Sequence, residues 1–201
     1  MMRRVDRWSL CLVAVALMLQ GCEAVNLSTE DQQALKDIEF VVVLPLTDGP
    51  EWTAEGSSWV ARGAVLQEMY RLGRYKIINI PRKEVEEAAA ATGYDVLDCY
   101  DPHVAAAIAR HLKADAVACG EITQWSTRQE TDSSSAPFVT STKTKTDHYV
   151  GLSLRVVAAD DAAILYTGAG NGFSNKGYTS AARLAAQQAT RELREFWRQM
   201  K

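Results

Sequence analysis

Short apolar runs recur along the chain at the lengths expected of β-strands. A continuous run rich in β-branched residues at 40–46 is typical of a strand buried on both faces of a sheet. Two later runs alternate apolar with polar residues, and the turn residues 159–162 separate them. These patterns predict strands at 40–46, 75–80, 114–122, 149–157 and from 163–166 onward.

Helical spacing of apolar residues fills the gaps between these runs. Gly73 ends the pattern over 55–72, as a glycine often does one residue beyond a helix. Asp101 and Pro102 are a typical N-cap and first helical residue. Helices are therefore predicted at 55–72, 81–91, 103–112 and 179–200. The order βαβααβββα indicates one α/β domain over 38–201, with a mixed β-sheet of about five strands flanked by helices.

Residues 126–147 break this pattern because they are almost entirely polar. Threonine alternates with other polar residues over 140–146, which favours an extended hairpin, although a loop is the alternative. Neither face of such a hairpin is apolar, so it lacks the lipid-facing side of a membrane-spanning hairpin. The insertion could line a lumen, contact a neighbouring subunit or remain in solvent.

The first 22 residues have the features of a lipoprotein export signal. Three arginines precede an apolar run over 8–19, which is shorter than the roughly 20 residues that span a bilayer. Leu19, Gln20, Gly21 and Cys22 are similar to the lipobox that lipoprotein signal peptidase recognises. We expect 1–21 to be a signal peptide, and 22–37 to be a lipidated N-terminus and tether.

This reading places a diacylglycerol and acyl lipid on the Cys22 thiol, and we expect no other cofactor. Several acyl chains hold a protein to a membrane far more firmly than one. Glu23 follows the cysteine instead of the aspartate that, by resemblance to enterobacterial lipoproteins, marks inner-membrane retention. The expected location is therefore the periplasmic face of the outer membrane.

Charge and cysteine content limit the possible functions further. Removing three arginines and one aspartate with the signal changes the formal net charge from −3 to −5, which argues against a nucleic-acid partner. Cys99 and Cys119 could pair in the oxidising periplasm or could be two buried thiols. Their spacing, without a matching histidine pair, predicts no metal site.

Residues arranged for catalysis are not evident in the sequence. The glycine-rich stretch 168–172 lacks the ending of a phosphate-binding loop, so we interpret it as bulge glycines in an edge strand. No serine lies in a nucleophile elbow, and no cysteine–histidine pair has a recognisable context. We therefore expect a protein that is not an enzyme.

Several short segments together resemble a superfamily of periplasmic lipoproteins that includes CsgG, PelC and LpoB. The similar segments are Val41-Val-Val-Leu-Pro-Leu46, Gly73-Arg-Tyr-Lys-Ile-Ile78 with Arg82, Leu112-Lys-Ala-Asp-Ala-Val117 with Gly120-Glu-Ile-Thr123, Val150-Gly-Leu-Ser-Leu-Arg-Val156 and Ile164-Leu-Tyr166. The likeness covers nearly the whole chain after the signal, and it implies a CsgG-like, anticodon-binding-domain-like fold.

The resemblance also implies a homo-oligomeric accessory lipoprotein of an outer-membrane export or secretion apparatus. Trp52 could contact the membrane interface in such an assembly. The alternative is an LpoB-like module that regulates a cell-wall synthase across the periplasm. A tether of about 15 residues spans at most roughly 50 Å, and this short reach favours the export accessory.

Overall fold

The computed structural model describes residues 27–49, 54–136 and 139–200. Within them lies a mixed six-stranded sheet with the order β3-β1-β4-β5-β6, and β2 pairs with β4 beside this path. The bounds are β1 Phe40–Val43, β2 Thr47–Asp48, β3 Lys76–Ile78, β4 Ala116–Ala136, β5 Val139–Ala158 and β6 Ile164–Ser174. Strands β3, β1 and β4 are parallel, whereas β5 and β6 are antiparallel additions. The predicted α/β fold is confirmed.

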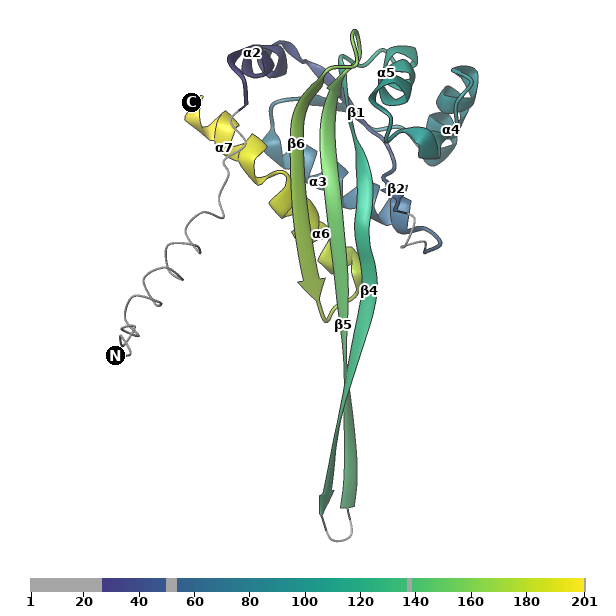
Figure 1. The fold of residues 1–201 in the computed structure, drawn as a ribbon, viewed down its shortest axis with the longest axis vertical. Coiled ribbons are helices and arrows are strands. Elements are labelled where there is room, and N and C mark those ends of the chain that lie inside the picture. Colours follow the sequence, from purple (N-terminus) through teal and green to yellow (C-terminus); the bar gives the residue numbers. More distant parts are fainter. Residues whose placement is uncertain (1–26, 50–53, 137–138, 201) are drawn as a thin grey trace, which may run out of the picture.

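Helices cover both faces of the parallel part of the sheet (Figure 1). One face of this part packs against α3 (Ser57–Leu72), and the other against α4 (Arg82–Ala91) and α5 (Pro102–His111). Helix α6 (Tyr178–Ala189) lies beside α3 and covers β5 and β6. Side chains of β1 alternate between the two faces: Val41 and Val43 join the first core cluster, and Val42 and Leu44 join the second. Val41, Val42 and Val43 of β1 are fully buried, as is Leu44 just beyond the strand, whereas Phe40 at its start is 37% exposed.

Local signals in the sequence set several helix ends. Gly73 ends α3 in the left-handed conformation, with φ 62°, where a residue without Cβ is favoured. The Asp101 carboxylate accepts a hydrogen bond from the His103 amide, and Pro102 is the first residue of α5. These two predictions are confirmed.

The segment predicted as a tether contains a helix that belongs to the domain. Ser28 caps α2 (Thr29–Asp37) by accepting a hydrogen bond from the Asp31 amide. Leu35 of this helix is fully buried in the first core cluster, which is why the helix is held against the body. The folded part therefore begins before residue 38, the boundary predicted from the sequence.

The predicted last helix is two helices. Thr190 interrupts the helix between α6 and α7 (Arg191–Gln199), and its hydroxyl donates a hydrogen bond to the Ala186 carbonyl. Such a bond from threonine to its own helix competes with regular helical pairing. Leu193 of α7 is fully buried, whereas Met200, just beyond this helix, is 45% exposed.

The glycines of β6 mark close packing, and the predicted bulge at this position is wrong. Pairing with β5 is regular at Gly168, Gly170 and Gly172, and the shift in register lies at Val156/Val157. A Cβ on Gly172 would lie 1.8 Å from the Ala181 carbonyl oxygen of α6, and one on Gly170 would lie 2.1 Å from that of Ala185. Only glycine lets this helix lie so near the strand.

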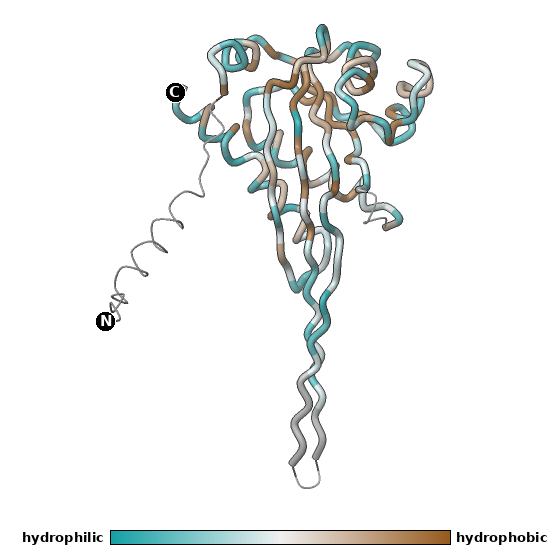
Figure 2. The backbone as a smooth tube through the Cα atoms, viewed as in Figure 1, coloured by the Kyte–Doolittle hydropathy of each residue, from teal (hydrophilic) through white to brown (hydrophobic). Residues whose placement is uncertain are grey.

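Strands β4 and β5 continue well beyond the rest of the sheet (Figure 1). The pairing of β6 with β5 ends at His148 opposite Ser174, so only two strands remain past this point. We call this two-stranded part, 127–136 with 139–147, the arm. Figure 2 shows apolar residues gathered in the body and mainly hydrophilic residues along the part of the arm nearest the body.

Candidate functional site: the polar arm

The arm is an antiparallel ladder without a break in register. Thr127 lies opposite His148, and the pairing continues to Ala136 opposite Val139. Ten residues of β4 at about 3.3 Å each extend the arm by roughly 33 Å. The predicted hairpin is therefore confirmed over the loop alternative, and it is the most prominent feature of the surface (Figure 1).

The two faces of the arm carry different chemistry because side chains alternate along each strand. One face carries opposite charges directly across the ladder, with Arg128 opposite Asp147 and Glu130 opposite Lys145. Within single strands, Arg128 pairs with Glu130 and Lys145 with Asp147, both at 3.0 Å. The other face carries hydroxyl and amide groups, from Thr127, Gln129, Thr131, Thr142, Thr144 and Thr146.

Aromatic side chains brace the root of the arm. The rings of Trp125 and Tyr178 stack at 4.5 Å with a 12° angle between their planes, and His148 meets Tyr178 edge-on at 4.6 Å. The hydroxyls of Thr127 and Tyr178 lie 2.5 Å apart. Because Tyr178 begins α6, these contacts fix the direction in which the arm leaves the body.

The carboxylate of Asp147 is buried at this root and is only partly hydrogen-bonded. It is 4% exposed, and its Oδ1 has no hydrogen-bond partner among the described residues. Its Oδ2 binds Lys145, and this hydrogen bond raises the pKa of that lysine. A buried carboxylate oxygen without a donor is rare in a folded protein. It marks a place where another molecule could supply a donor.

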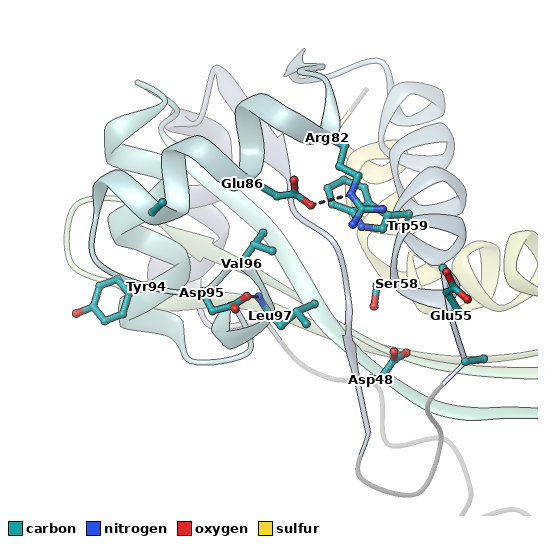
Figure 3. A pocket seen from close by; sticks show the side chains of 13 residues that line it. Asp48, Glu55, Ser58, Trp59, Arg82, Glu86, Tyr94, Asp95, Val96 and Leu97 are labelled. Atoms are coloured by element: carbon teal, nitrogen blue, oxygen red, sulfur yellow. Dashed lines mark hydrogen bonds and ion pairs between the residues drawn. The ribbon is translucent and has the colours of Figure 1, made fainter.

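A second concave site lies at the carboxyl ends of the parallel strands, where α/β proteins often bind ligands (Figure 3). This cleft of about 690 Å³ is lined by the start of α3, by α4 and by the 3₁₀ helix η1 (Val96–Asp98). Its charged groups are largely engaged already. Asp48 accepts from the Ser57 hydroxyl, Arg82 pairs with Glu86, and Asp95 caps η1.

The aromatic floor of this cleft is the half-buried Trp59 of α3. The guanidinium groups of Arg62 and Arg82 lie 5.4 and 5.0 Å from the centre of the Trp59 ring. The cleft thus presents an aromatic ring and charged groups that are already paired, with the Ser57 hydroxyl bonded to Asp48.

Four arginines gather elsewhere, around a pocket of about 140 Å³ between the ends of α3 and α7. We call the cluster Arg71, Arg74, Arg194 and Arg198 the arginine pocket. Sequence reasoning missed it because more than a hundred residues separate its two halves. The only local signal was basic residues in the last turns of two helices.

The residues predicted to direct lipidation, and the one predicted to contact the membrane, lie outside the described residues. These are Leu19, Gln20 and Gly21 for signal-peptidase recognition, Cys22 for the lipid, and Trp52 for membrane contact. Their roles stay predictions. Nothing in the described ranges groups three potential metal ligands, and no helix there is long and apolar enough to cross a bilayer.

Cys99 and Cys119 are both buried in the second core cluster, and both are free thiols in this structure. The Cys99 thiol donates to the Pro45 carbonyl at 3.0 Å. Burial raises the pKa of Cys99 to about 12, and it also raises the pKa of Cys119. Whether the two cysteines pair in the periplasm stays a prediction.

Comparison with known proteins finds likeness among solved structures alone, since no family model and no curated protein matches the chain. Lipoprotein GNA1162 from Neisseria meningitidis is 16% identical, at a TM-score of 0.45 over 68% of this chain and 83% of that one. A PelC dodecamer from Paraburkholderia phytofirmans is 13% identical, with a TM-score of 0.46 over 79% of this chain and 89% of that one. The LpoB C-terminal domain from Escherichia coli is 11% identical, with a TM-score of 0.43 over 83% of this chain and 98% of that one. The similar structures thus include PelC and LpoB, which the sequence motifs resemble.

Proposed function

We propose that this chain is a lipid-anchored periplasmic accessory lipoprotein that assembles with copies of itself through the arm, as part of an outer-membrane export or secretion apparatus. The observation that carries the proposal is the arm, a long polar hairpin with two free edges. The lipid anchor itself rests on the sequence pattern that ends at Cys22.

The arm is a poor candidate for a structure that stands alone. A two-stranded hairpin is marginally stable in water, and none of the described side chains of the arm belongs to either core cluster. Each outer edge presents unpaired backbone donors and acceptors, which readily pair with another strand. Threonine-rich strands favour such pairing. Addition of a strand from another chain would stabilise the arm.

A second copy of the chain fits this requirement. In a ring whose arms all point the same way, β4 of one copy runs beside β5 of the next in the antiparallel sense. At the same register, Arg128 would face Asp147 and Glu130 would face Lys145, as they do within one hairpin. Opposite charges directly across a ladder stabilise pairing. The unpartnered Oδ1 of Asp147 could then accept from a neighbouring copy.

The same arm supports a second candidate, a contact with a cell-wall synthase. Helix α2 lies at the end of the molecule opposite the far end of the arm (Figure 1), and Leu27 comes two residues before it. Four residues lie between Cys22 and Leu27, so the two can be at most about 18 Å apart. With the lipid at that end, the arm would reach away from the anchoring membrane and could meet a partner there.

Charge reversal on the arm tests self-assembly. Glu130→Lys places like charges across the ladder at Lys145, and Glu130→Lys with Lys145→Glu restores the opposite pair. We expect light scattering of the lipoprotein in detergent to show a discrete oligomer for the natural chain and a smaller species for the single variant. The double variant should regain the oligomer, because each cross-strand pair contributes about 0.2–1 kcal/mol and a ring repeats it.

Lys83→Glu on the exposed face of α4 is the matched control, since its partner Glu87 is also exposed. It should leave the molar mass unchanged. A natural chain that stays monomeric at every concentration would refute self-assembly. A photo-crosslinker placed at Thr144 would then identify a partner other than a second copy, as the synthase contact requires.

A further inference from the structure

The arginine pocket concentrates positive charge on a protein that is acidic as a whole. Its lining residues are Arg71, Leu72, Arg74, Arg194, Trp197 and Arg198. The cavity of about 140 Å³ is of a size that a small oxyanion could occupy. Arginine is suited to such a ligand because its planar fork of donors matches the oxygens of a phosphate or carboxylate group.

One carboxylate in the described part of the chain contacts this cluster, and it lies beneath it. Glu68 is 1% exposed, and its two oxygens bind Arg71 at 2.5 Å and Arg194 at 2.9 Å. One negative charge therefore faces four positive ones. Glu68 acts as a positioning residue, because it holds two of the guanidinium groups in place without neutralising the pocket.

The other side of the pocket is fixed by aromatic contacts. The Arg74 guanidinium lies 5.4 Å from the centre of the Trp197 ring, and the Trp197 indole donates to the Tyr75 hydroxyl at 3.0 Å. Among the described residues, neither Arg74 nor Arg198 forms an ion pair. These two cations remain available for an anion.

The place of the pocket identifies the source of that anion. Trp197 packs against the same core cluster as Leu27, the first described residue, and Figure 1 shows α2 and α7 at the end opposite the arm tip. Helix α7 contains arginines and the half-buried Trp197, and the exposed Met200 follows it. This composition is typical of a helix at a membrane surface.

We propose that the arginine pocket binds the phosphate group of an anionic phospholipid headgroup in the membrane that anchors the chain. The inference relies on the lipid anchor of the proposed function, but not on assembly through the arm. Such a contact would hold the body against the membrane and direct the arm away from it.

An environment-sensitive dye on Gln199→Cys, beside the pocket, tests this contact in the native lipoprotein reconstituted into vesicles. Cys99 and Cys119 are buried and should stay unlabelled. We expect a blue shift of the dye in vesicles containing phosphatidylglycerol, and little shift in phosphatidylcholine alone. Added salt should reduce the shift. The same dye on Lys143→Cys in the arm should not respond.

A double variant with Arg74→Gln and Arg198→Gln removes the two free cations and leaves Glu68 paired with Arg71 and Arg194. Each neutralised arginine should lower the ratio of docked to undocked protein about fivefold. Lys83→Gln with Arg183→Gln removes the same charge at exposed positions elsewhere and should change little.

Equal dye shifts in both vesicle types, or an unchanged shift in the arginine variants, would overturn the proposal. Titration of inorganic phosphate into the detergent-solubilised protein separates the sources. If free phosphate binds and the variants abolish that binding while vesicles give no shift, the lipid source is wrong. Flotation of the lipoprotein with vesicles tests the anchor separately, so a failed anchor is distinguished from a failed pocket.

Discussion

At the scale of single residues, burial governs the chemistry of the two cysteines. Cys99 and Cys119 both lie in the core cluster between the sheet and α4 and α5, away from solvent. Desolvation disfavours the thiolate, which is why the pKa of Cys99 rises to about 12 and that of Cys119 rises as well. Because the thiolate is the nucleophile, buried thiols of this kind are chemically inert.

Alkylation of the folded protein with iodoacetamide at pH 8 should therefore be slow at both cysteines. Unfolding in urea without reductant should expose two reactive thiols, each adding one alkyl group that mass spectrometry detects. If unfolding releases none until a reductant is added, the two cysteines form a disulfide in the periplasmic protein.

At the scale of elements, the close contact between β6 and α6 depends on residues without side-chain bulk. Gly168, Gly170 and Gly172 of the strand meet a helix whose buried positions are alanines. Small residues on both sides let the backbones approach until strand and helix are nearly in contact. This layer covers the antiparallel half of the sheet and braces the root of the arm through Tyr178.

Gly172→Ala should separate these two elements, because its Cβ would lie 1.8 Å from a backbone oxygen that cannot rotate away. We expect a loss of about 3 kcal/mol in the free energy of unfolding, measured by urea denaturation. Gly63→Ala in α3 is the control, since nothing lies within 4 Å of its Cβ. That variant should be more stable by about 0.5–1 kcal/mol. Equal stability of both variants would contradict the close-packing account.

At the scale of the whole molecule, the body and the arm are separable. The body holds both core clusters and every helix of the described residues, whereas the arm is a ladder of polar residues. Helix α7, which lines the arginine pocket, and the far end of the arm lie at opposite ends of the molecule (Figure 1). This separation places membrane contact and partner contact on different surfaces.

Replacing residues 128–147 with a two-residue Asn-Gly turn, which joins the paired Thr127 and His148, should therefore leave the body folded. We expect the midpoint of thermal unfolding of a monomeric preparation to change by only a few degrees, because no core residue is removed. Self-assembly should be lost. Collapse of the body, seen by circular dichroism, would show that the arm contributes to folding.

Local patterns in the sequence were sufficient for much of this structure. The buried β1 strand, the ends of α3 and α5 and the polar hairpin depend on residues near one another in the chain. A buried run, a left-handed glycine and an aspartate N-cap act over a few residues, so their effect can be read before the fold is known.

The tertiary structure alone determined the features that depend on approach between distant segments. The docking of α2 through Leu35, the role of the β6 glycines and the pairing of Glu68 with Arg194 each require two parts of the chain to meet. The sequence by itself determined where strands and helices form and which segment is polar. Which side chains face one another across the body depends on how the elements pack, because packing and charge interactions act over a few ångströms in space, whatever the separation along the chain.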